Sequence, residues 1–300
     1  MINSLKLQTK IFALISIFNL FSFNNLKAEE ILFISAIPDQ NPERLNRLYN
    51  TLSSELSEQL NVKVRYVPVV NYASAVTAFR TGNLDLVWFG GLTGVQARLQ
   101  TVGAKVLVQR DIDENFHSVF IANKNSSLKK ILNINDLESL KNKRFTFGSE
   151  SSTSGRLMPQ YFLSQAGIEL NDFKGGRPGF SGSHDATLML VQSGSYDAGA
   201  LNEQVWKSNL KRGRIDTSKV FVMWKTPSYY DYHWIVQGNL DEKFRKGFTK
   251  ELRNVFLNFD KKSSNQKNIL KLFGANKFII TDAKNYDEIE MIGKMIGKIK

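Results

Sequence analysis

The sequence predicts an α/β protein of two lobes, in which mainly parallel sheets are flanked by helices. Short apolar patterns typical of strands alternate with amphipathic helical patterns along most of the chain. About 270 residues follow an apolar N-terminal segment, which is more than one hydrophobic core usually holds. We therefore expect one lobe from residues 29–122 and 236–300 and a second lobe from residues 123–235, with two chain crossings that form a hinge.

The first 28 residues have the pattern of a secretory signal peptide. Lys6 and Lys10 form a basic start, residues 11–23 are an apolar run too short to span a bilayer comfortably, and Ala28 ends an imperfect cleavage site. The alternative is an uncleaved N-terminal anchor. Cleavage after Ala28 would release an exported soluble protein, for which a bacterial periplasm fits best.

The composition excludes several kinds of chemistry and of partner. The chain has no cysteine, which rules out disulfides, thiolate catalysis and most structural zinc sites. Loss of Lys6, Lys10 and Lys27 with the signal peptide would lower the formal net charge from +12 to +9. The remaining lysines are scattered and no basic stripe carries interleaved aromatic residues, so we expect no nucleic-acid partner. We interpret the charge as solvated surface that helps anions approach, and we expect a monomer.

The first part of the chain shows clear strand and helix patterns. Asn41 and Pro42 are typical of a helix start, and leucines recur at helical spacing up to Leu60. A second helix is expected from Ala73 to Arg80, with Gly82 as its stop. Short strands are expected at 31–34, 62–66, 84–89, 106–108 and 119–121.

The second part continues the alternation. Strands are expected at 144–147, 197–201, 220–224 and 234–236, and helices at 136–140 and 185–193. After the last strand, Phe244, Phe248, Leu252 and Phe256 mark one long amphipathic helix. We expect this C-terminal part to return to the first lobe.

A hydroxyl-rich turn between a strand and a helix is the most informative stretch. The strand 144–147 is followed by Gly148, by five hydroxyl side chains and by a helical pattern; the hydroxyls belong to Ser149, Ser151, Ser152, Thr153 and Ser154. Free backbone N–H groups and the positive end of the helix dipole favour an anion there. The alternative is a strong helix cap with spare serines, although one hydroxyl would satisfy a cap. The turn therefore predicts an oxyanion site.

Other candidate groups lie where open α/β sheets place ligands. Tyr72 follows a strand ending near Val69, Gly90 ends another strand and allows close backbone approach, and His184 begins a helix. Glu203 and Asp231 follow or precede strands, and would suit a ligand with an ammonium group or an acidic P–OH proton. The alternatives are a plain turn at Gly90, an incidental histidine at a helix cap, and ordinary loop or helix-cap acids.

The sequence does not favour an enzyme. Ser183, His184 and Asp185 are consecutive, so their side chains point in different directions and cannot form a catalytic relay. No strand–GxSxG–helix elbow is present. The three histidines are widely spaced and no acidic cluster has metal-ligand spacing, so we expect neither a metal nor a cofactor.

Taken together, several stretches make the chain similar to a known family. In order and spacing they resemble the phosphonate/phosphite-type substrate-binding proteins of ABC transporters, which have the type II periplasmic binding protein fold. The resemblance covers essentially the whole chain after the signal peptide. The stretches that carry it are 35–38, 48–49, Tyr72, 82–90, 136–143, 152–155 with Pro159, 182–184 and 196–198.

The resemblance implies two lobes that close on a small tetrahedral oxyanion, a phosphonate or phosphite, and deliver it to an inner-membrane permease without any reaction. Ser152, Thr153 and Ser154 match the family's anion-holding turn, and His184 matches its second donor. Tyr72 matches an aromatic hydroxyl from the first lobe. Glu203 and Asp231 match acids that face the ammonium group in aminoalkyl-phosphonate binders.

Two departures from the family pattern leave the ligand open. Phe116 stands where a tyrosine is usual, and residues 91–94 lack an expected aromatic side chain. Another oxyanion such as selenate or phosphate is therefore the alternative ligand. An enzyme or a sensory domain on the same fold is the alternative function.

Overall fold

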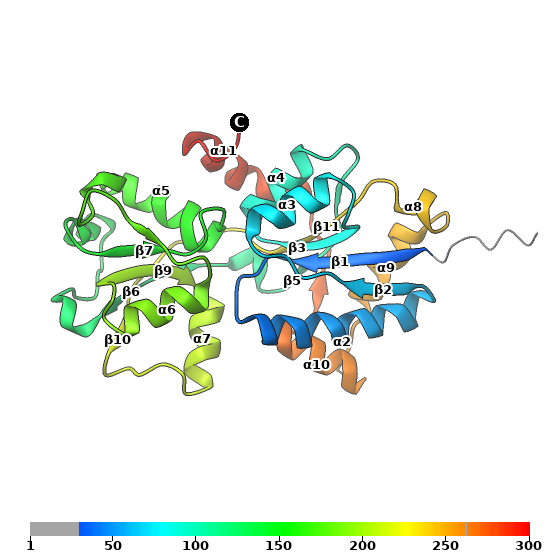
Figure 1. The fold of residues 1–300 in the computed structure, drawn as a ribbon, viewed down its shortest axis with the longest axis horizontal. Helices are drawn as coiled ribbons and strands as arrows, with labels where there is room; N and C mark the ends of the chain where they lie inside the picture. The colour runs from blue at the N-terminus through cyan, green and yellow to red at the C-terminus, as the bar shows by residue number, and fades with distance from the viewer. Residues whose placement is uncertain (1–29, 262) are drawn as a thin grey trace, which may run out of the picture. The chain divides into compact units, whose positions relative to one another are not determined.

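The structure is a computed structural model that describes residues 30–261 and 263–300. The predicted signal peptide lies outside the described residues. Two five-stranded sheets organise the described chain, with strand orders β2-β1-β3-β11-β4 and β10-β6-β9-β7-β8 (Figure 1). We refer to them as the first and the second sheet.

The first sheet begins with three parallel strands. β1 (Ile31–Ala36) pairs with β2 (Lys63–Tyr66) and β3 (Leu86–Phe89). β11 (His233–Val236) runs antiparallel to β3 and to β4 (Lys105–Val106). The strand that closes this sheet therefore comes from a distant part of the sequence.

The second sheet has the same mixture of directions. β7 (Phe145–Phe147) is parallel to β8 (Gly179–Phe180) and β9 (Ala198–Asn202). β6 (Ser118–Asn123) is antiparallel to β9 and to β10 (Val220–Lys225). The predicted α/β class is confirmed. In each sheet four of the five strands share one direction, and the reversed strand is β11 in the first sheet and β6 in the second. β6 and β11 both follow a crossing between the sheets, and each enters its sheet antiparallel to its neighbours.

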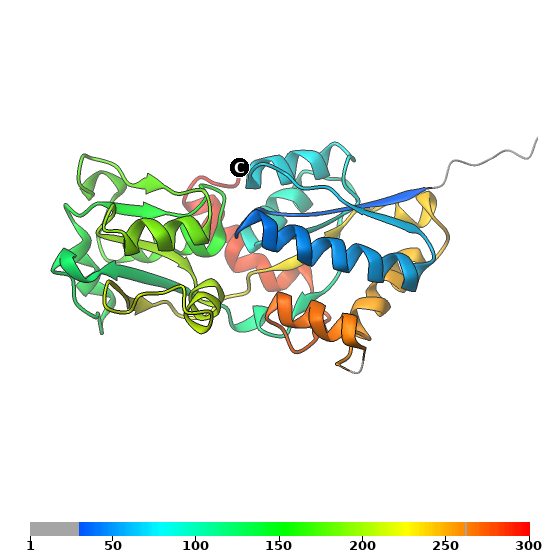
Figure 2. The ribbon, with the colours of Figure 1, turned by 60° about the horizontal axis from the view of Figure 1, so that its bottom comes forward.

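Helices pack against both sheets. Those that follow or precede strands of the first sheet are α2 (Pro42–Leu60), α3 (Tyr72–Arg80), α4 (Gly91–Leu99), α8 (Leu240–Lys243), α9 (Phe248–Leu257), α10 (Ser264–Phe273) and α11 (Asp287–Met295). Those of the second sheet are α5 (Met158–Gln165), α6 (His184–Gln192) and α7 (Glu203–Lys211). α2 and α10 lie side by side, as both Figure 1 and Figure 2 show. A small two-stranded sheet joins β5 (Gln109–Arg110) to β12 (Phe278–Ile279).

The expected long helix from Phe244 to Phe256 is wrong. The chain forms two helices there, α8 and α9, and Gly247 between them has a φ of 84°. A left-handed residue cannot continue a right-handed helix, and glycine adopts that conformation at little cost. The apolar spacing across the break nevertheless persists, because Phe244 and Phe248 stack on each other with ring centroids 4.4 Å apart.

The chain crosses between the sheets earlier than the predicted boundaries imply. β6 pairs in the second sheet although residues 118–122 were expected with the first lobe, and β11 pairs in the first sheet although residues 233–235 were expected with the second. The two crossing segments, 111–117 and 226–232, run side by side, and Phe116 and Tyr229 exchange two backbone hydrogen bonds. This backbone pairing explains the shift, because strand-like hydrogen bonding continues into both crossings.

Aromatic side chains dominate the core beneath the first sheet. Trp234 is fully buried and its ring lies within 6.3 Å, centroid to centroid, of the rings of Tyr49, Trp88, Phe256 and Phe273. Large rings bury much apolar area each, which stabilises the strand ends that carry polar groups. Within the described part of the chain, no helix combines the length and the apolar character needed to cross a bilayer.

Candidate functional site

The hydroxyl-rich turn is buried at the end of β7. The Ser152 hydroxyl accepts a hydrogen bond from the Gly155 amide at 2.9 Å, and residues Thr153–Leu157 form a π-helical turn that leads into α5. Ser152, Thr153 and Ser154 are each at most 2% exposed. One hydroxyl therefore caps the helix, as the alternative interpretation requires, and two more are buried beside it.

A second helix start meets this turn. The Gly91 amide, at the beginning of α4, donates to Asp231 Oδ1 at 2.8 Å, and the Leu92 amide donates to Thr153 Oγ1 at 2.9 Å. Gly90 is in close contact with the same two side chains, because a Cβ atom there would lie 3.1 Å from Thr153 Oγ1 and 3.2 Å from Asp231 Oδ1. The structure thus brings Gly90, Thr153 and Asp231 together from α4, the serine turn and a crossing segment.

Asp231 is the unusual member of the cluster. Burial raises the pKa of its carboxyl to about 7, while the Gly91 amide and the Thr153 and Ser154 hydroxyls act in the opposite direction. Its Oδ1 atom caps α4, which matches the helix-cap alternative. Its Oδ2 atom, however, is buried without a partner at normal hydrogen-bond geometry among the described residues.

Tyr72 lies at the start of α3 and is 2% exposed. Its hydroxyl has no partner at normal hydrogen-bond geometry among the described residues, although the Ser152 hydroxyl is near enough to lower its pKa slightly. Burial raises the pKa of Tyr72 well above its usual value, so the group stays protonated and can donate. A buried polar atom without a partner costs free energy. Tyr72 and Asp231 therefore offer one donor and one acceptor that a ligand could satisfy.

His184 lies at the start of α6 with both ring nitrogens facing protein groups. Nδ1 accepts from the Asn202 amide at 3.3 Å, and Nε2 lies 3.3 Å from the Tyr232 hydroxyl. Burial lowers the pKa of His184 to about 4, so the ring is neutral near pH 7. Its Cε1 edge faces the serine turn, 3.1 Å from where a Cβ on Gly155 would lie. This geometry gives His184 a positioning role, and its expected direct donation to an anion stays a prediction.

Glu203 is not brought into the cluster. Its carboxylate lies 2.9 Å from Lys207 Nζ and 3.6 Å from Lys225 Nζ. Glu203 is also the first residue of α7, where an acid complements the helix dipole. The alternative interpretation of an ordinary helix-start acid therefore describes Glu203 better than that of a ligand group.

Sequence reasoning missed Asp39, and it considered Tyr232 only among the aromatic residues of 229–234 that could wall a small pocket. The Tyr232 hydroxyl donates to Asp39 Oδ2 at 3.0 Å and accepts from Asn202 Nδ2 at 3.0 Å. Burial raises the pKa of Asp39 to about 6. An acid that follows β1 at its carboxyl end is a signal that could have found this group, because ligand sites of open sheets gather there.

Tyr229 is a further hydroxyl that was not singled out. Its hydroxyl lies 2.7 Å from Ser118 Oγ, and Ser154 also contributes a hydrogen bond that lowers its pKa, although burial raises that pKa overall. Phe116, which replaces a usual tyrosine, packs its ring against Tyr229 and Tyr232. The groups around the serine turn thus include hydroxyls and backbone amides that can donate hydrogen bonds, together with the buried Asp231 carboxyl.

Three comparisons with known proteins bear on this geometry. Residues 34–286 match the profile of a family described as the periplasmic substrate-binding protein of phosphonate ABC transporters. The chain is 56% identical over 284 residues to a probable ABC transporter phosphite binding protein, PhnD1, of Prochlorococcus marinus strain MIT 9301, covering 95% of this chain and 96% of the relative. It is also 26% identical over 282 residues to the phosphonates-binding periplasmic protein of Escherichia coli K12, covering 89% of this chain and 79% of that protein.

A solved structure agrees with the sequence matches. The structure of Prochlorococcus marinus PhnD1 in complex with methylphosphonate superposes with a TM-score of 0.89 at 57% identity, covering 90% of this chain and all of that chain. Its relatives are transporter components rather than enzymes. The chain therefore belongs to the family of periplasmic substrate-binding proteins of phosphonate ABC transporters.

Proposed function

We propose that this protein captures a small monoprotonated phosphorus oxyanion, methylphosphonate or phosphite, at the serine turn. The observation that carries the proposal is the pair of unsatisfied buried atoms, the Tyr72 hydroxyl and Asp231 Oδ2, beside Ser152, Thr153 and Ser154. A tetrahedral anion with one P–OH group would accept from the hydroxyls and donate to the carboxylate. The name of the Prochlorococcus relative, and its complex with methylphosphonate, support the same ligand class.

Asp231 makes a specific contribution to selectivity in this proposal. An ionised carboxylate repels a fully ionised oxyanion but accepts a hydrogen bond from a P–OH group. Sulfate and methanesulfonate carry no such proton, so where the Asp231 carboxyl is ionised, above its pKa of about 7, they would leave Oδ2 both unpaired and repelled. We then expect the protein to bind methylphosphonate and phosphite but not sulfate. Phosphate and selenate are the alternative ligands, and their affinities must be compared with those of methylphosphonate and phosphite.

The two sheets also fit a protein that opens and closes. We propose that each sheet is the core of one lobe and that the paired crossings, 111–117 and 226–232, form the hinge. Hydrogen bonds join groups of the two sheets, from the Leu92 amide to Thr153 and from the His184 amide to the Asp39 carbonyl. We further propose that the first 28 residues direct export to the periplasm, and that the closed monomer docks on an inner-membrane permease.

Isothermal titration with a panel of anions tests the ligand. We expect methylphosphonate and phosphite to bind and sulfate and methanesulfonate to give no heat above dilution. Phosphate, selenate and 2-aminoethylphosphonate complete the panel, because Glu203 is paired with lysines and leaves Asp231 as the acid near the turn. Sulfate binding as tight as that of methylphosphonate would contradict the role proposed for Asp231. Absence of binding heat with every phosphorus ligand would refute the proposed function.

A further inference from the structure

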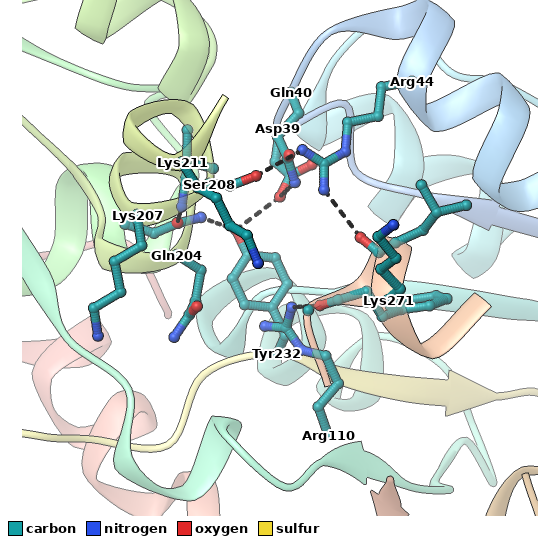
Figure 3. A pocket seen from close by; sticks show the side chains of 15 residues that line it. Asp39, Gln40, Arg44, Arg110, Gln204, Lys207, Ser208, Lys211, Tyr232 and Lys271 are labelled. Atoms are coloured by element: carbon teal, nitrogen blue, oxygen red, sulfur yellow. Dashed lines mark hydrogen bonds between the residues drawn. The ribbon is translucent and has the colours of Figure 1, made fainter. Parts of the chain in front are cut away.

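A pocket of about 290 Å³ lies beside the buried site (Figure 3). It is lined from both sheets, by Arg44 of α2 and Lys271 of α10 on one side and by Lys207 and Lys211 of α7 on the other. The side chains of these residues surround it in Figure 3. We call it the outer pocket.

A thin wall of side chains separates the outer pocket from the serine turn. Asp39, Asn202 and Tyr232 line the pocket, and the Tyr232 hydroxyl is 3.3 Å from His184 Nε2. The adjacent Cε1 atom of the His184 ring faces Gly155 in the serine turn. The outer pocket and the buried site are therefore neighbours on one path, and the groups between them belong to both sheets.

Cations outnumber carboxylates on the lining of the outer pocket. Lys207 is paired with Glu203, and Arg110 is paired with Asp113. Lys211 and Lys271 are exposed and make no ion pair within the described part of the chain. Asp39 is the pocket's carboxyl group, and it is occupied by the Tyr232 hydroxyl.

Arg44 adds a further positive charge at the junction of the two sheets. Its guanidinium donates to the Ser208 hydroxyl at 3.1 Å and to the Leu272 carbonyl at 3.0 Å. Both acceptors are neutral, so these bonds fix the guanidinium, and the carboxylates of Asp39 and Asp185 act on it electrostatically without an ion pair at contact distance. The outer pocket therefore combines an immobilised cation with two free lysines, whereas the hydroxyls of Ser152, Thr153 and Ser154 are uncharged.

We infer that the outer pocket is an outer anion site, which collects the phosphorus oxyanion before it passes to the serine turn. This inference rests on the proposed function. Charges at a solvent-filled mouth act over several ångströms and raise the encounter rate of an oppositely charged ligand. They add little to the final complex, because the anion leaves them for neutral buried donors. The outer pocket should thus control association and not dissociation.

Stopped-flow fluorescence on the full mature protein tests the inference with methylphosphonate. Trp88 is a suitable reporter, because its ring stacks on Tyr232 with centroids 5.8 Å apart. In the double variant Lys211→Gln/Lys271→Gln we expect the association rate constant to fall about three- to tenfold at low ionic strength, with the dissociation rate constant unchanged. The deficit should shrink at about 0.5 M salt, where screening removes interactions between exposed charges.

The matched control is Lys63→Gln/Lys246→Gln, which removes the same charge elsewhere. Lys63 pairs with Ile31 at the start of β1, at the end of the sheet opposite to Asp39. Lys246 follows Arg245, whose guanidinium bonds the Leu60 carbonyl near that same end. Equal slowing of association in the control would overturn the inference, because net charge alone would then explain the rate. A change confined to the dissociation rate constant would also overturn it, because the lysines would then contact the anion in its final complex. Absence of any methylphosphonate binding to the unsubstituted protein would instead refute the proposed function.

Discussion

The serine turn and the outer pocket are neighbours that offer an anion opposite kinds of partner. Ser152, Thr153 and Ser154 are at most 2% exposed and present neutral hydroxyls, whereas Lys211 and Lys271 are exposed and charged. Burying an unpaired charge costs far more than burying a hydrogen-bonded hydroxyl. In the function that we infer, the exposed lysines attract the anion at a place where water solvates their charge. The buried neutral donors then hold the anion at a place from which water is excluded.

This contrast also separates rate from selectivity. Exposed lysines attract any small anion, so they cannot distinguish methylphosphonate from sulfate. Buried donors and acceptors distinguish ligands by hydrogen-bond pattern, because a mismatched ligand leaves a buried group unpaired. Substitutions in the two regions should therefore alter different measured quantities, and four variants test this difference.

The largest effect is expected from Ser154→Ala. The Ser154 hydroxyl is 1% exposed, and its hydrogen bonding lowers the pKa of both Asp231 and Tyr229. Loss of one donor to a desolvated anion should weaken methylphosphonate binding about 10- to 100-fold, measured by titration calorimetry. Ser151→Ala is the matched control, because Ser151 belongs to the same turn but is only partly buried. Equal effects of the two variants would mean that the anion does not bind at the buried hydroxyls.

Asp231→Asn should weaken methylphosphonate binding but stabilise the ligand-free protein. The pKa of Asp231 is raised to about 7 in the folded state, so its favourable contribution is complete below pH 4 and is lost as the pH rises through 7. The amide does not titrate, and we expect the variant to gain on the order of 1–2 kcal/mol in unfolding free energy at pH 8. Denaturant unfolding at pH 8 and pH 4.5 measures this, with the gain fading at the lower pH. An equal gain at both values would exclude the titration of Asp231 as its cause.

A moderate effect is expected from His184→Ala. The ring contacts Asn202 through Nδ1 and Tyr232 through Nε2, and the Cε1 atom between these nitrogens faces Gly155. Loss of the ring should therefore weaken methylphosphonate binding about three- to tenfold through mispositioning. His184→Gln can still accept from the Asn202 amide and donate to Tyr232, and it should restore most of the affinity. Failure of glutamine to restore binding would favour direct donation from the histidine to the anion.

The smallest effect is expected from Glu203→Gln. Its carboxylate pairs with Lys207 and Lys225 near the surface, and such pairs contribute little to stability. Because Lys207 lines the outer pocket, freeing its charge should raise the association rate by less than about twofold and leave dissociation unchanged. A loss of affinity as large as that of Ser154→Ala would place Glu203 in the inner site after all.

Much of the fold could be predicted from local sequence patterns. The errors lie where one apolar pattern is compatible with two different structures. The predicted helices at 42–60 and 185–193 correspond closely to α2 and α6, because cap residues and apolar spacing mark them directly. The helix predicted across 244–256 was wrong because apolar spacing continued through Gly247 while the backbone did not. The sheet membership of β6 could not be read locally, because a short apolar strand fits either sheet equally well.

The strand, serine turn and helix that present buried hydroxyls are encoded locally, because they depend on neighbours a few residues apart. Asp231 and Glu203 have the same expected role in the sequence, and long-range packing is what distinguishes them. The fold places one against the Gly91 amide in a buried cluster and the other beside two lysines at the surface. The physical reason is that burial and charge partners set the behaviour of a carboxyl group, and both come from residues distant in the chain.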